Sequence, residues 1–198
     1  MKKPFVPKKY QLSYNETAKR KVIEVLCMFP EKEFSLSDLA KEAGVKKSNI
    51  GSILDEFHKE GLVQITKLRK LWRINANQGS FNFAKIKILQ NLSIIYQAGL
   101  VEFLNDHFKN PKAIILFGSF RKGDDISTSD IDIAIESDDV KEYQVIGLRE
   151  LAQLEKEIGG RKIQIHLFNQ KNIDINVFNN IANGIVLWGF LQVMPWTK

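Results

Sequence analysis

The feature that most constrains this chain lies between residues 113 and 135. Residues 113–117, Ala-Ile-Ile-Leu-Phe, form a continuous apolar run, which is typical of a buried strand. The run ends at a Gly118-Ser119 turn, and after a polar loop of ten residues the sequence Asp-Ile-Asp-Ile-Ala-Ile begins at Asp130. Because side chains alternate along a strand, we predict a second strand that carries Asp130 and Asp132 on one face and isoleucines on the other.

This pair of segments predicts a metal and phosphate site. Carboxylates two residues apart on a strand start about 6–7 Å apart at the backbone, so Asp130 and Asp132 can reach one divalent cation. Mg²⁺, or Mn²⁺ in its place, accepts such oxygen ligands and completes its shell with waters and substrate phosphates. Gly118 allows close backbone approach to phosphate, while Ser119 can donate a hydroxyl and Lys122 a positive charge. The alternative is a solvated strand face without a ligand.

The segment LFGSFRKGDDISTSDIDIAIES resembles the signature of the polymerase-beta-like nucleotidyltransferases, in particular the minimal nucleotidyltransferase group. It shares Gly123 after a basic residue and Ser129 directly before Asp130, and the resemblance adds Ser129 to the nucleotide-binding residues. It extends over about residues 83–193, including the closing IANGIVLWGFLQV. The resemblance implies Mg²⁺-dependent transfer of a nucleoside monophosphate from a nucleoside triphosphate to a protein or small-molecule acceptor. Antitoxin members of the group modify a partner protein, so a toxin-like partner is one candidate acceptor.

One departure from the family pattern affects the expected activity. Active members carry a third carboxylate on a later strand, but the corresponding segment 162–168, KIQIHLF, places Gln164 and His166 there. His166 could accept a proton because its ordinary pKa lies near neutrality, or it could be structural. We expect a working transferase that uses Asp130, Asp132 and His166. The alternative is a DNA-binding transcriptional regulator whose degenerate domain senses nucleotide or binds a partner.

Residues 16–75 carry a second pattern. Apolar spacing predicts helices over 17–28, 38–43 and from Lys46 to about residue 60, followed by strands at 62–66 and 71–75. The text FSLSDLAKEAGVKKSNIGSILDEFHKEGLVQITKLRKLWRIN resembles the winged helix-turn-helix family. In that family the second helix of the motif enters the major groove and the wing contacts the DNA backbone or minor groove.

The resemblance implies contacts to double-stranded DNA from two places. We expect these at the start of the third helix and at the wing tip, from Lys46, Lys47, Ser48, Asn49, Ser52, Lys67, Arg69 and Lys70. Residues 1–80 hold 16 Lys and Arg against 9 Asp and Glu, a net charge of +7, whereas residues 81–198 hold 13 against 14. A basic first half suits a polyanionic partner. The alternatives are a solvated lysine-rich surface, or a winged helix used only for protein contacts.

The sequence therefore predicts an α+β protein of two domains. A polar break at 76–80 separates a winged helix-turn-helix domain, 1–78, from a nucleotidyltransferase-like domain, 79–198, in which a long helix over 83–109 precedes a mixed sheet. The long helix could bend near Gly99, and it could bridge the domains or form a dimer contact.

We expect a cytoplasmic homodimer, because no apolar run is long enough to span a membrane and because such DNA binders match two-fold sites. The single cysteine, Cys27, is expected in the core.

Overall fold

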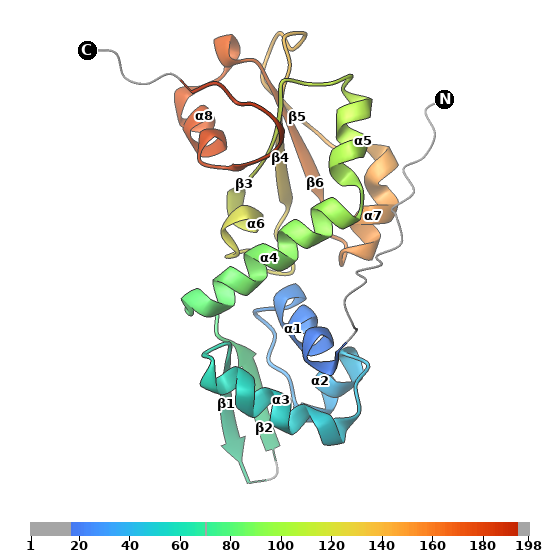
Figure 1. The fold of residues 1–198 in the computed structure, drawn as a ribbon, viewed down its shortest axis with the longest axis vertical. Helices are drawn as coiled ribbons and strands as arrows, with labels where there is room; N and C mark the ends of the chain where they lie inside the picture. Colours follow the sequence, from blue (N-terminus) through green and yellow to red (C-terminus); the bar gives the residue numbers. More distant parts are fainter. Residues whose placement is uncertain (1–16, 70, 194–198) are drawn as a thin grey trace, which may run out of the picture. The chain divides into compact units, whose positions relative to one another are not determined.

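The computed structural model describes residues 17–69 and 71–193, which form two compact units (Figure 1). The N-terminal unit comprises residues 17–91 together with Gly123–Ser127. The C-terminal unit comprises Leu92–Lys122 and residues 128–193. The short segment Gly123–Ser127 thus separates two parts of the C-terminal unit in sequence. A functional division at residues 78 and 79 stays a prediction.

The N-terminal unit begins with three helices, α1 (Ala18–Met28), α2 (Leu36–Glu42) and α3 (Lys47–Lys59). They are followed by an antiparallel hairpin of β1 (Val63–Leu68) and β2 (Leu71–Ala76). Thr17 and Ser35 cap α1 and α2 by accepting hydrogen bonds from backbone N–H groups of the first turn. The three predicted helices and the predicted hairpin are all present.

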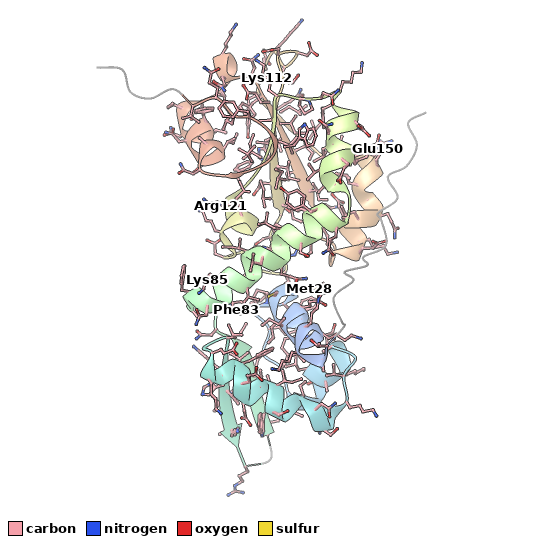
Figure 2. The ribbon with its side chains drawn as sticks, in the orientation of Figure 1. Met28, Phe83, Lys85, Lys112, Arg121 and Glu150 are labelled. Carbon is pink, nitrogen blue, oxygen red and sulfur yellow. The ribbon has the colours of Figure 1, made fainter. Side chains whose placement is uncertain are left out.

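The core of this unit draws on every one of these elements. Phe34 pairs with Ile74 through two backbone hydrogen bonds, which joins the segment before α2 to β2. Phe83 from the next helix packs into the same cluster (Figure 2). Cys27 is 3% exposed, and burial raises the pKa of its thiol to about 12, so the prediction of a core cysteine is confirmed.

The predicted helix over residues 83–109 is two helices. The first, α4 (Phe81–Gln97), ends before Ala98-Gly99, and α5 (Leu100–His107) follows. Gly99 has a φ of +71°, a left-handed conformation that ends a helix and that glycine adopts without strain. The apolar periodicity continues on both sides of the break, which is why the sequence predicted one helix. Among the described residues, no helix is long and apolar enough to cross a bilayer.

The C-terminal unit is built on a five-stranded sheet with the order β5-β6-β4-β3-β7. The strands are β3 (Ala113–Phe117), β4 (Ile131–Glu136), β5 (Gln144–Ile146), β6 (Ile163–Phe168) and β7 (Ile185–Gly189). Only the β4–β6 pair is parallel, so the sheet is mixed, as predicted. Besides α5 and the last residues of α4, this unit contains the helices α6 (Gly118–Lys122), α7 (Ala152–Glu157) and α8 (Ile175–Ala182), with 3₁₀ turns at Arg149–Leu151 and Gln170–Asn172.

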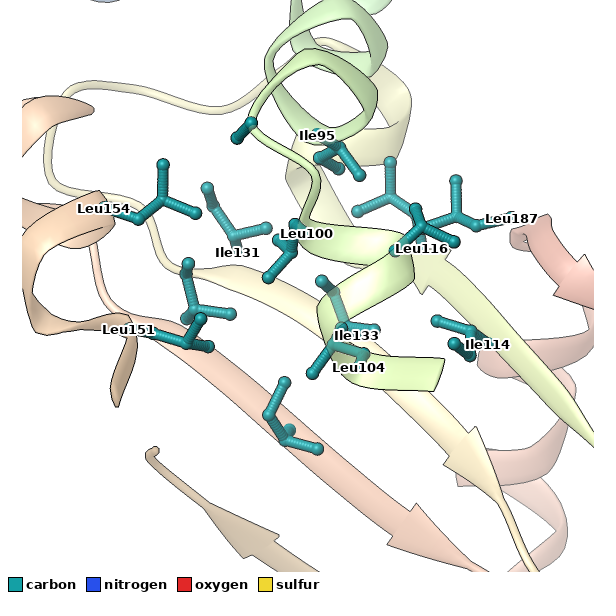
Figure 3. Packing of buried hydrophobic residues seen from close by; sticks show 14 of the residues in the cluster. Ile95, Leu100, Leu104, Ile114, Leu116, Ile131, Ile133, Leu151, Leu154 and Leu187 are labelled. Atoms are coloured by element: carbon teal, nitrogen blue, oxygen red, sulfur yellow. The ribbon is translucent and has the colours of Figure 1, made fainter. Parts of the chain in front are cut away.

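The two faces of the sheet are covered differently. Ile131, Ile133 and Ile135 of β4 point to one face, where they pack with residues of α5 and α7 (Figure 3). Ala134 packs on the opposite face with Phe168 and with Ile181 of α8. The predicted alternation along β4 is therefore confirmed. Asp132 lies between the inward-pointing isoleucines in sequence and shares the face of α8.

Candidate active site

Strand pairing brings the two halves of the motif together. In the antiparallel pair β3–β4, Phe117 lies opposite Asp132, so that Gly118 follows directly at the end of β3. In the parallel pair β4–β6, Asp132 lies beside Gln164 and Ala134 beside His166. The polar side chains of β4 and β6 consequently share one face and one end of the sheet.

Gly118 is required by the closeness of Asp132. Its φ is +73°, and a Cβ built on it would collide with Oδ2 of the Asp132 carboxylate. Only glycine satisfies both conditions, since it accepts the left-handed conformation and leaves room for the carboxylate. The residues after it form a helix of one turn, α6, where the sequence predicted a turn and a polar loop.

Each aspartate has a polar partner on β6. The amide Nε2 of Gln164 donates to Asp130, and His166 Nε2 lies 3.3 Å from Oδ1 of Asp132. Tyr143 Oη lies 2.6 Å from Nδ1 of the same imidazole. Because a carboxylate only accepts hydrogen bonds, the imidazole proton of a neutral His166 lies on Nε2, and the Tyr143 hydroxyl donates to Nδ1.

The His166 imidazole also contacts an aromatic ring. Its ring meets the Phe117 ring edge to face, with 4.8 Å between centroids. Burial and the negative charge of Asp132 raise the pKa of Tyr143, which keeps its hydroxyl protonated and able to donate. The chain Tyr143–His166–Asp132 is therefore an ordered set of hydrogen bonds beside Gly118.

A cavity of about 240 Å³ lies next to Gly118. It is lined by Phe117, Gly118, Arg121, Lys122, Asn180 and Asn183. Arg121 and Lys122 come from α6, Asn180 comes from α8, and Asn183 is the C-cap residue of α8. Neither cation has an acidic partner among the described residues. Two cations and two carboxamides around a space of this size suit a phosphate-bearing ligand.

The sequence singled out some of these residues and missed others. Gly118 and Lys122 line the cavity, whereas the half-buried Ser119 and Ser129 are not part of the lining described above. Arg121 could have been included, because it stands beside Lys122 in the motif. Tyr143, Asn180 and Asn183 give no signal in the sequence. They reach the site only through the β5–β6 pairing and the packing of α8.

The donor atoms suit a divalent cation that arrives with its substrate. Asp130 and Asp132 provide carboxylate oxygens, and Mg²⁺ in phosphate-transfer sites is bound by one or two carboxylates plus phosphate oxygens. In the part of the chain that the structure describes, no cluster of three or more His, Cys, Asp or Glu side chains is arranged to hold a metal ion. The residues present thus fit a metal that shares its coordination with a nucleotide.

The predicted DNA contacts lie on the surface of the N-terminal unit. The five residues at the start of α3 are all exposed: Lys46, Lys47, Ser48, Asn49 and Ser52. At the hairpin, Lys67 and Arg69 are exposed, while Lys70 lies outside the described residues. Lys67 is 3.4 Å from Asp55 and lies 4.0 Å over the Trp72 ring, so this cation has partners within the unit.

The mixed sheet carries paired aspartates beside a strand that ends in a glycine. Residues 99–189 match the family described as Polymerase beta, Nucleotidyltransferase. The match contains β3, α6, β4 and β6, and with them both halves of the motif. No curated protein and no solved structure matches the chain significantly.

Proposed function

We propose that the C-terminal domain is a nucleotidyltransferase that uses Mg²⁺ or Mn²⁺. It transfers a nucleoside monophosphate from a nucleoside triphosphate to a hydroxyl of a protein or small-molecule acceptor. The observation that carries this proposal is the packing of the Asp132 carboxylate, the proposed metal ligand, against Gly118 at the end of β3. The cavity with Arg121 and Lys122 beside Gly118 supports it.

The residues divide the chemistry between them. Lys122, Arg121 and the backbone at Gly118 hold the triphosphate, and Ser119 and Ser129 add hydroxyl donors. Asp130 and Asp132 would hold the metal, which neutralises phosphate charge when bound. The acceptor oxygen forms a bond to the α-phosphorus, the bond to the oxygen bridging to the β-phosphate breaks, and pyrophosphate leaves with that electron pair. Positioning and charge stabilisation provide most of the rate.

His166 has two roles in this proposal. In the tautomer described above it donates to Asp132 and so orients that carboxylate. It can accept the hydroxyl proton of the acceptor only when the imidazole proton lies on Nδ1 and is donated to the Tyr143 oxygen, because Nε2 is then a free acceptor. His166 therefore orients Asp132 in one tautomer and can act as the general base in the other.

A transfer assay tests the proposal. The protein is incubated with Mg²⁺ or Mn²⁺, cell extract, and each nucleoside triphosphate labelled either in the α- or in the γ-phosphate. Transfer of α-label and not of γ-label is expected, with loss of at least 100-fold in a D130N/D132N variant. The matched control is D138N/D139N, which changes two exposed aspartates of the same unit. Transfer of γ-label, or equal activity in both double variants, would contradict the proposal.

A second function is supported by a specific observation. The partners of Asp130 and Asp132 on β6 are an amide and an imidazole, where active members of the family place a carboxylate. This favours a transcriptional regulator that binds nucleotide without turnover. Tight, metal-dependent nucleotide binding without label transfer would select this alternative.

We further propose that the three helices and hairpin form a winged helix that binds double-stranded DNA, in a cytoplasmic homodimer. The exposed cations Lys46, Lys47 and Arg69 support this assignment. Binding of duplex DNA should weaken steeply with salt, because counterions are released. Changing these three residues to Gln should weaken it further and reduce the salt slope. Absent or salt-independent binding by the wild-type protein would reject the assignment, and light scattering tests the dimer.

A further inference from the structure

Five of the ten residues that separate the two halves of the motif, Gly123–Ser127, have an unusual location. The chain passes from Lys122 of the C-terminal unit into Gly123–Ser127, which is part of the N-terminal unit, and returns at Thr128. Asp130 follows two residues later. The residues just before the candidate metal ligands thus follow a segment that contacts α4 and Glu31.

A buried ion pair anchors this segment. Lys87 of α4 is 1% exposed and Asp125 is fully buried, and Lys87 Nζ lies 3.2 Å from Asp125 Oδ1. The same ammonium group donates to the Asp125 carbonyl oxygen, and Asn91 Nδ2 donates to Oδ1 at 2.9 Å. Burial of a charge is costly unless the charge is paired. This network of pairs therefore fixes Asp125 against α4.

The start of the segment is equally restricted. Gly123 has a φ of +74°, and a Cβ on it would lie 2.8 Å from the carbonyl oxygen of Ala84 and 3.0 Å from Ile88 Cγ1. The backbone of Gly123 therefore lies directly on α4. Only glycine allows this approach, because any side chain would displace the segment.

The last residue of the segment, Ser127, is bound by Glu31, which lies between α1 and α2. The Glu31 carboxylate accepts from the Ser127 N–H at 3.2 Å and from the Ser127 hydroxyl. Partial burial alone would raise the pKa of Glu31, but the hydrogen bonds from Ser127 outweigh it and hold the pKa below its ordinary value. Glu31 is therefore ionised and accepting at neutral pH.

We propose that Lys87, Asn91 and Glu31 are positioning residues for the nucleotide and metal site, acting through Gly123–Ser127. The inference rests on the proposed function. Lys87 and Asn91 fix the middle of the segment, and Glu31 fixes its last residue, so that residues 128–130 begin from a defined point. A change at Glu31 in the N-terminal unit will accordingly alter nucleotide affinity, and by linkage nucleotide binding will alter the order of this segment.

The contact between Glu31 and Ser127 allows a test that spares the buried core. The protein is titrated calorimetrically with ATP, GTP, CTP and UTP in the presence of Mg²⁺, and the triphosphate that the wild type binds most tightly is kept as the probe. Glu31→Gln and Ser127→Ala should each weaken its binding at least threefold. Glu33→Gln should not, because this neighbouring glutamate pairs with Arg73 instead.

Two further measurements separate positioning from general damage. Urea unfolding should give the same free energy for Glu31→Gln and Glu33→Gln, and amide exchange over residues 123–130 should speed up only in Glu31→Gln and Ser127→Ala. If the wild type binds none of the four triphosphates, the proposed function fails. If it binds one, and Glu31→Gln and Ser127→Ala leave both affinity and exchange unchanged or Glu33→Gln weakens binding equally, this inference is wrong.

Discussion

At the scale of single residues, Gly118 carries two separate requirements. A residue with a side chain would lose about 1–2 kcal/mol of folding free energy in the left-handed backbone conformation at this position. The collision of a Cβ with Asp132 adds a local displacement of the proposed metal ligand. The first requirement concerns the stability of the fold, whereas the second concerns the site.

A pair of glycine variants separates these effects. Gly118→Ala and Gly160→Ala should each lower the free energy of unfolding by about 1–2 kcal/mol, because both residues have a positive φ. A Cβ at Gly160 meets nothing within 4 Å, so only Gly118→Ala should weaken metal-dependent nucleotide binding, by tenfold or more. Chemical unfolding and calorimetry measure the two quantities. Equal nucleotide affinity in both variants would show that the approach of Asp132 to Gly118 has no functional role.

At the scale of secondary structure, the sequence predicted what local periodicity determines. The apolar run at 113–117 and the alternation from Ile131 to Ile135 identified β3 and β4, and the helix predicted over 38–43 is α2, which begins at Leu36. The sequence predicted a possible bend near Gly99 and not the break between α4 and α5, because a left-handed glycine leaves no mark on hydrophobic periodicity. Tyr143 could not be assigned to the site at all, since only the pairing of β5 with β6 brings it to His166.

The anchoring of Gly123–Ser127 on α4 also makes a prediction at this scale. Lys87→Met leaves the buried Asp125 carboxylate without its partner and should lower stability by about 3–5 kcal/mol. The double variant K87M/D125L removes both charges and should recover most of this loss. Lys85→Met is the matched control, because Lys85 lies on the same helix over the ring of the exposed Phe81. Urea unfolding curves measure all three, and a loss below about 1 kcal/mol in Lys87→Met would contradict the burial of this pair.

At the scale of the whole molecule, the chain joins a basic helical unit to a nucleotidyltransferase-like domain. The likeness of residues 99–189 to the polymerase beta nucleotidyltransferases agrees with the resemblance that the motif indicated. The helices and the hairpin of the N-terminal unit were also predictable, but what they bind is a matter of surface chemistry rather than of fold. The segment Gly123–Ser127 was read in the sequence as a loop of the motif, and its placement in the N-terminal unit is known only from the structure.

The central claim is that Asp130 and Asp132, beside Gly118, form one metal and nucleotide site. It is shared by the transferase and by the nucleotide-sensing alternative. Nucleotide binding measured calorimetrically with and without Mg²⁺ tests it most directly, in the wild-type protein, D130N/D132N and the control D138N/D139N. Wild type and control should bind a triphosphate only with the metal, and D130N/D132N should lose at least tenfold in affinity. Metal-independent binding, or binding that D130N/D132N retains in full, would contradict it.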